Sequence, residues 1–168
     1  REWVMTSRRE EILERLGGSR LFAAVASRVA PPVDRALYRR LGGRTLGAGP
    51  QTLLLTTRRR SSGRMRTVPL LYVRDGERLA VAASNWGRKE HPRWSEDLLA
   101  DPRALVEVGG SPPEERRARL ATPREREKLW PRFLELWPAY AAYQRRCGRQ
   151  IRVFVLEPSR RETPPMLG

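Results

Sequence analysis

The residues best suited to chemistry lie in an arginine-rich stretch between two apolar, β-prone segments. Five arginines occur within nine residues, and no acidic residue separates them: Arg58, Arg59, Arg60, Arg64 and Arg66. Guanidinium groups bind phosphate or carboxylate oxygens through paired hydrogen bonds. Ser61, Ser62 and Gly63 add two hydroxyls and a permissive backbone to the same turn. The stretch is predicted to bind an anion, with a solvated, charged hairpin turn as the alternative.

A second candidate site begins where the apolar segment 79–83 ends. Ala83, Ser84 and Asn85 are small, and small residues at the end of a strand let a flat ring lie against the backbone. The Ser84 hydroxyl can donate a hydrogen bond to a carbonyl, and Trp94 can form one wall of a pocket. A surface loop with an exposed tryptophan is the alternative interpretation.

Three aromatic residues near the C-terminus form a third candidate. Tyr140 and Tyr143 share one face of a predicted helix, and a break at Pro138 places Trp137 near them. The three rings can line an apolar slot whose hydroxyls are available to a substrate oxygen. Packing of the same rings in a hydrophobic core is the alternative.

The composition limits the classes of function. The chain has 168 residues, which suits one domain, and its single cysteine excludes an internal disulfide framework. One histidine leaves no His/Cys cluster for zinc, so no metal site is predicted. The net charge is +15, and only two of the 34 basic residues are lysines. A cytoplasmic protein is expected, because no apolar run approaches the roughly 20 residues needed to span a bilayer.

The hydrophobic pattern predicts an α+β fold built on an antiparallel barrel. Short β-prone segments predict five or six strands, at residues 53–57, 67–73, 79–83, 105–108, 117–120 and 151–156. Asp75 and Gly76 predict a tight hairpin between the second and third of these. Helices are predicted at 92–99, at 122–137 with a capping box at its start, and after Pro138. Closure into a barrel is the best way to relieve such a small sheet of its edges.

Around this barrel the chain is predicted to form a single domain in three parts. Residues 1–45 form a helical segment packed on the barrel, residues 46–158 form the barrel itself, and residues 159–168 form a flexible tail. The basic N-terminal helices either cap the protein's own core or contact the anionic inner face of a membrane.

These motifs, in this order and at this spacing, resemble the deazaflavin-dependent nitroreductase family. The resemblance spans about residues 41–157 and is carried by segments 54–57, 64–70, 81–84, 91–94 and 137–144. Members of this family are quinone or nitroaromatic reductases that use coenzyme F420 on a split β-barrel related to the FMN-binding barrels. The resemblance implies an oxidoreductase that transfers a hydride from reduced F420 to a quinone-like, nitroaromatic or other activated unsaturated acceptor.

The resemblance also implies roles for individual residues. The implied coenzyme-binding residues are Arg60, Ser61, Ser62, Gly63, Arg66, Thr67, Pro69, Ala83, Ser84 and Asn85. The implied substrate-binding residues are Trp94, Trp137, Tyr140 and Tyr143, and the implied catalytic hydrogen-bond donors are Ser84 and Tyr140. The sequence departs from the family pattern at several positions. Arg59 stands where the family has glycine, Ser61 where it has lysine and Asp97 where asparagine is usual, and Trp86 adds bulk near the pocket mouth.

Other functions stay open on the sequence alone. FMN is an alternative cofactor, because its phosphate could bind in the same arginine turn. A charge of +15 would also suit a nucleic-acid-binding protein. No specific nucleic acid is predicted, however, because the aromatic residues have core-like helical spacing and are not interleaved with the arginines. A barrel that binds a coenzyme without turnover is a further alternative, and both a monomer and a homodimer fit the sequence.

Overall fold

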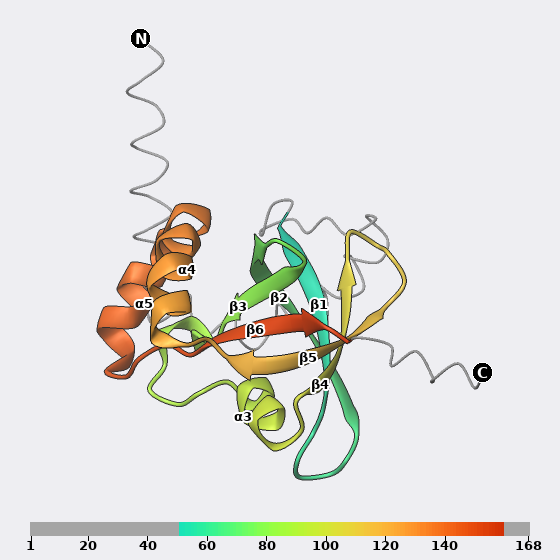
Figure 1. Cartoon of the computed structure of the whole chain (residues 1–168). Coiled ribbons are helices and arrows are strands. Elements are labelled where there is room, and N and C mark those ends of the chain that lie inside the picture. Colours follow the sequence, from blue (N-terminus) through green and yellow to red (C-terminus); the bar gives the residue numbers. More distant parts are fainter. Residues whose placement is uncertain (1–50, 160–168) are drawn as a thin grey trace, which may run out of the picture.

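Six antiparallel strands close into a barrel in the computed structural model, which describes residues 51–159 (Figure 1). The order around the barrel is β1-β2-β3-β6-β5-β4. The strands are β1 (Thr52–Arg58), β2 (Met65–Asp75), β3 (Arg78–Ala82), β4 (Arg103–Val108), β5 (Glu114–Leu120) and β6 (Val153–Pro158). The helical elements are η1 (Asn85–Gly87), α3 (Arg93–Ala100), α4 (Pro123–Leu136) and α5 (Ala139–Cys147). The predicted α+β barrel of about six antiparallel strands is therefore confirmed.

The predicted hairpins are also confirmed. Arg58 pairs with Met65 at the end of the β1–β2 ladder, so residues 59–64 of the arginine-rich stretch form the turn between these strands, and Arg66 lies in β2. Asp75 pairs with Arg78, which leaves a tight β2–β3 turn at Gly76, whose φ of +64° suits glycine. Pro69 is tolerated within β2 because the strand pairs only with β1 at this point and with β3 from Tyr72 onward.

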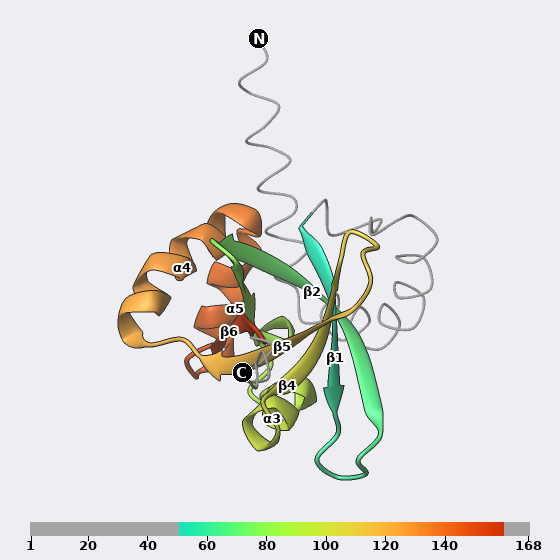
Figure 2. The same cartoon turned by 45° about the vertical axis from the view of Figure 1, so that its right-hand side comes forward.

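Apolar side chains fill the barrel and also cover one of its outer faces. The interior cluster contains alternate residues of β1, Leu53 and Leu55, together with Val81 and Phe154. A second cluster lies between the barrel wall and helices α4 and α5, where Phe133 and Leu129 pack. Figures 1 and 2 show these two helices together on one side of the barrel, while α3 lies apart from them near the β1–β2 turn.

The final strand begins later than the sequence pattern predicts. The apolar segment 151–156 is expected as one strand, but β6 starts at Val153. The Ile151 N–H donates to the Gln144 side chain of α5 at 3.0 Å, so the end of α5 holds this position outside the ladder. The predicted N-terminal helical segment, 1–45, and residues 160–168 of the predicted tail lie outside the described residues. Within 51–159, no helix is both long and apolar enough to cross a membrane.

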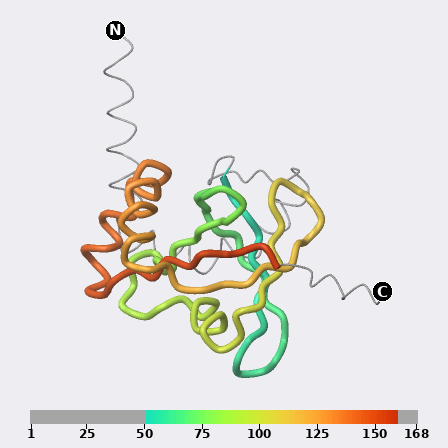
Figure 3. Tube along the Cα trace, viewed as in Figure 1, coloured from blue at the N-terminus to red at the C-terminus, as the bar shows by residue number. Residues whose placement is uncertain are grey.

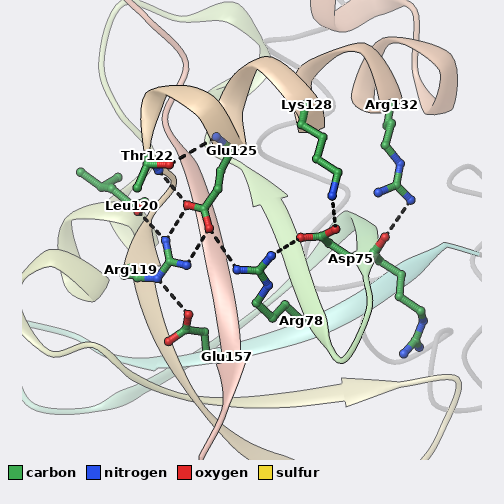
Figure 4. A network of polar contacts seen from close by, with 10 residues as sticks. Asp75, Arg78, Arg119, Leu120, Thr122, Glu125, Lys128, Arg132 and Glu157 are labelled. Atoms are coloured by element: carbon green, nitrogen blue, oxygen red, sulfur yellow. Dashed lines mark hydrogen bonds and ion pairs between the residues drawn. The ribbon is translucent and has the colours of Figure 1, made fainter.

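A polar network centred on Glu125 attaches the start of α4 to the barrel (Figure 4). The predicted capping box is present. The Thr122 side chain accepts a hydrogen bond from the Glu125 N–H, and the Glu125 carboxylate accepts one from the Thr122 N–H at 2.9 Å. The same carboxylate accepts from Arg119 of β5 at 2.7 and 2.8 Å and from Arg78 of β3 at 3.0 Å. The hydrogen bonds from Arg119, and after them the one from the Thr122 N–H, hold the pKa of Glu125 down at about 2.

Replacing Glu125 with glutamine is expected to lower the free energy of unfolding at pH 7 by about 1 kcal/mol. Glutamine keeps the capping geometry but loses the charge that Arg119 and Arg78 bind. Because the folded pKa lies below the unfolded one, this contribution is present above about pH 4.5 and is lost as pH falls toward 2. Urea unfolding at pH 7 and pH 3 measures it, with Glu127→Gln on the exposed face of α4 as control. Equal losses at both pH values would contradict the ionic assignment.

Candidate functional site

The arginine turn is closed by its own backbone, which leaves its side chains outward. Arg59 N–H donates to the Arg64 carbonyl at 2.9 Å, and Gly63 N–H donates to the Arg59 carbonyl at 2.8 Å. Gly63 has a φ of +67° and an exposed position, so the permissive backbone predicted for this turn is used. Arg60, Ser61 and Ser62 are also exposed, so a ligand can reach their side chains.

Helix α3 supports this turn through Asp97. The Asp97 carboxylate accepts from the Arg60 N–H at 3.1 Å, and the residue is only 4% exposed. Its second carboxylate oxygen is buried without a hydrogen-bond partner among the described residues. The carboxylate therefore fixes the turn and places one negative charge beneath the arginines.

The arginines near the turn repel one another. Arg66 is half-buried, and its pKa is lowered first by burial and then by the positive charges of Arg59 and Arg93, while Asp97 opposes the shift. A guanidinium that is partly desolvated among other cations gains from an incoming anion more than an isolated surface arginine does. These residues fit a phosphate-bearing ligand on electrostatic grounds.

Thr67 and Pro69 belong to the barrel wall that leads away from the turn. The Thr67 hydroxyl is 2.8 Å from the hydroxyl of Thr56 on β1, and Pro69 is opposite Leu54 in the β1–β2 register. Both are half-buried on β2. Both residues follow Arg66 along β2, the strand that begins directly after the arginine turn.

The segment after β3 forms a second wall, with an unusual backbone. Ala83 is fully buried and its N–H donates to the Arg152 carbonyl at 2.8 Å. Ser84 is half-buried with helical angles, and it is followed by three consecutive left-handed residues, Asn85, Trp86 and Gly87, at φ values of 48°, 57° and 72°. Left-handed angles are costly for residues with a side chain, so the surrounding contacts must hold this turn.

The predicted aromatic residues divide into two groups. Trp94 packs inside the barrel, with its ring centroid 5.7 Å from that of Phe154. Trp137, Tyr140 and Tyr143 lie together in the outer cluster under α4 and α5, where the two tyrosine rings are 6.0 Å apart. Tyr140 is 5% exposed and burial raises its pKa well above the usual range, so its hydroxyl keeps its proton. The structure thus brings the three C-terminal rings together and places Trp94 in a different cluster.

Comparison with known proteins decides the family. The model of the F420H(2)-dependent quinone reductase family matches residues 33–158. The chain belongs to this family. The F420H(2)-dependent quinone reductase Rv1261c of Mycobacterium tuberculosis is 35% identical over 133 residues, which cover 72% of this chain and 85% of that protein. The protein Rv3178 of the same organism is 37% identical over 117 residues, covering 67% of this chain and 98% of its own length.

Two solved structures are similar in both sequence and fold. An F420-H2 dependent reductase, FDR-A, is 37% identical with a TM-score of 0.58, covering 64% of this chain and 94% of its own. A chain described as a domain-swapped dimer is 34% identical with a TM-score of 0.60, covering 74% of this chain and 96% of its own. The resemblance to deazaflavin-dependent reductases on a split barrel is therefore confirmed.

In this member of the F420H(2)-dependent quinone reductase family, the sequence pattern did not reveal the residues that support the second wall. Arg146, Arg149 and Arg152 contact the segment between Ala83 and Glu96, and all three come from the end of α5 or the loop after it. Their regular spacing of three residues was the available signal. In a chain with so many arginines that spacing is not distinctive. Within 51–159, no three His, Cys, Asp or Glu side chains gather as a metal site.

Proposed function

We propose that this protein is an oxidoreductase that transfers a hydride from reduced coenzyme F420 to a quinone-like acceptor. The observation that carries the proposal is the gathering of the half-buried Arg66 of β2 with Arg59 and Arg93, beside a turn that α3 fixes through Asp97. Such a site is suited to the phosphate of a coenzyme. Membership of the F420H(2)-dependent quinone reductase family supports F420 as that coenzyme.

Each part of the site has a proposed role toward the coenzyme. Arg60 and Arg66 bind the anionic tail, and the Ser62 hydroxyl adds a hydrogen bond. The half-buried Ser84 is proposed to flank the ring, and the fully buried Ala83 before it supports this wall from behind. The reduced deazaflavin supplies the hydride, so the protein's task is to orient the ring and the acceptor and to exclude water.

The acceptor is proposed to lie against three aromatic residues just before α5 and within it, Trp137, Tyr140 and Tyr143. Trp137 and Trp86 are half-buried, and the Trp86 ring meets Tyr143 edge-on with centroids 6.3 Å apart. Aromatic rings favour flat acceptors, so nitroaromatic compounds are included with quinones in the proposal. The protonated Tyr140 hydroxyl is a proposed donor to the acceptor oxygen that gains charge.

A titration of the protein with oxidised coenzyme F420, followed by the coenzyme's own fluorescence, tests the proposal. Binding at micromolar or lower concentration is expected, with weaker binding of FMN under the same conditions. Steady-state reduction of a soluble quinone by reduced F420 then tests turnover. Preference for FMN would move the function to a flavin-dependent reductase on the same barrel, and binding of neither would reject a coenzyme site.

Replacing Ser84 with alanine is expected to lower kcat about 10-fold or more while changing coenzyme affinity little. The half-buried hydroxyl is available at the ring-facing wall, and loss of one hydrogen bond made in the transition state costs roughly 1.5–3 kcal/mol when the acceptor oxygen carries charge. Stopped-flow oxidation of reduced F420 by quinone measures the effect. An unchanged rate would remove Ser84 from the mechanism.

The protein is further proposed to act as a homodimer in the cytoplasm. The similar solved chain described as a domain-swapped dimer supports a dimer over a monomer. Light scattering of the purified protein distinguishes the two states. Contact of the basic N-terminal residues with a membrane surface stays a prediction from the sequence.

A further inference from the structure

The segment that follows β3 has its carbonyl groups bound by arginines from a distant part of the chain. Arg149 donates to the carbonyl of Lys89 at 2.8 Å, and to that of Glu90 at 3.0 Å. The same guanidinium reaches the Ser84 carbonyl at 3.3 Å and the Ala83 carbonyl at 3.4 Å. One side chain thus joins both ends of the segment 83–90 by hydrogen bonds. Figure 3 traces this segment beside the chain that leaves α5.

Arg146 binds the middle of the same segment. Its guanidinium donates to the Trp86 carbonyl and, at 3.5 Å, to the Gly87 carbonyl. It also lies over the Tyr143 ring, 5.5 Å from the centroid. Arg146 therefore links the turn of left-handed residues to the tyrosine that is proposed to face the acceptor.

These contacts compensate an unfavourable backbone. Asn85 and Trp86 have left-handed angles, at φ values of 48° and 57°, which are unfavourable for residues with a side chain. The segment lies between β3 and α3, so its carbonyl groups do not accept hydrogen bonds from a neighbouring strand of the barrel. A planar guanidinium with five fixed donors can bind several such carbonyls at once, which the single ammonium of lysine does poorly. Burial lowers the pKa of Arg149, in agreement with its position against the segment.

We propose that Arg149, assisted by Arg146, is a positioning residue that fixes the segment 83–90 before the coenzyme binds. Ala83 and Ser84 then present a ready-made wall to the deazaflavin ring, and no binding energy is spent on ordering it. The role of the wall rests on the function proposed above. The order of the segment 83–90 in the coenzyme-free protein does not depend on that function, and it can be measured separately.

Hydrogen–deuterium exchange on the coenzyme-free protein tests the first part of the proposal. In Arg149→Met, the amides of residues 83–91 are expected to exchange at least 10-fold faster than in the wild type, while those of α4 are unchanged. Arg149→Lys is expected to fall between the two, because the ammonium keeps the charge but not the forked donors. Arg145→Met is the matched control, since Arg145 is an exposed arginine of α5, the helix that ends shortly before Arg149.

The same variants are then titrated with oxidised F420. The dissociation constant is expected to rise about 10-fold in Arg149→Met, less in Arg149→Lys and not in Arg145→Met. Unchanged exchange in Arg149→Met, or faster exchange throughout the barrel, would overturn the positioning role. Faster exchange confined to residues 83–91, with wild-type affinity for F420, would also overturn it. Failure of the wild type to bind F420 is seen before any variant is compared, and it rejects the proposed function.

Discussion

Replacing Arg66 with alanine is expected to weaken binding of oxidised coenzyme F420 by 10- to 100-fold. A charge-assisted hydrogen bond contributes roughly 1.5–3 kcal/mol, and each 1.4 kcal/mol is a factor of ten in the dissociation constant. Arg66 is half-buried beside Arg59 and Arg93, so its charge is less screened than that of the exposed arginines of the turn. Fluorescence titration at fixed ionic strength measures the change.

The opposite change of charge provides the matched control. In the wild type the Arg60 N–H donates to the Asp97 carboxylate at 3.1 Å. Asp97→Asn keeps an oxygen that can accept this hydrogen bond but removes a buried negative charge beside Arg66. Affinity for an anionic tail is therefore expected to rise several-fold in this variant. Equal affinities in the wild type and both variants would show that the anion binds elsewhere.

The fold could be predicted largely from local signals that tertiary structure did not override. The Asp75-Gly76 pair determines a turn and the Thr122 capping box determines a helix start, and each involves only neighbouring residues. Both predictions are confirmed. Closure of the barrel followed from the count of short strands and the cost of open edges. The start of β6 was wrong by two residues because a side chain of α5, Gln144, takes the Ile151 N–H, and no local pattern encodes that contact.

The candidate site was predictable only where one stretch of chain carries it. The arginine turn is a single hairpin, so its side chains are neighbours in sequence and in space. The aromatic residues come from α3, from α5 and from the junction of α4 with α5, and residue type does not tell which cluster a ring enters. Trp94 packs inside the barrel with Phe154, whereas Tyr140 packs outside it with Phe133. The contacts of Arg149 with residues 83–90 join positions about 60 apart in the chain, beyond the reach of any periodicity.

Replacing Gly87 with alanine is expected to lower the free energy of unfolding by about 2–4 kcal/mol. Gly87 has a φ of +72°, which alanine adopts at a cost of roughly 1–2 kcal/mol. A Cβ at this position would also lie 2.8 Å from the Cα of Tyr143 and 3.0 Å from the Arg146 guanidinium. The Cα belongs to the backbone of α5 and cannot turn aside, so η1 and α5 must separate. Denaturant unfolding measures the loss.

Gly76→Ala separates the two causes of that loss. Gly76 has a similar φ of +64°, but an added Cβ would meet nothing within 4 Å, so only the conformational cost of about 1–2 kcal/mol is expected there. The difference between the two variants is then the cost of the close approach of η1 to α5. Because separating these elements also displaces Arg146 from the Trp86 carbonyl, only Gly87→Ala is expected to weaken coenzyme binding. Equal effects of both variants on stability and affinity would mean that α5 does not hold the wall of the site.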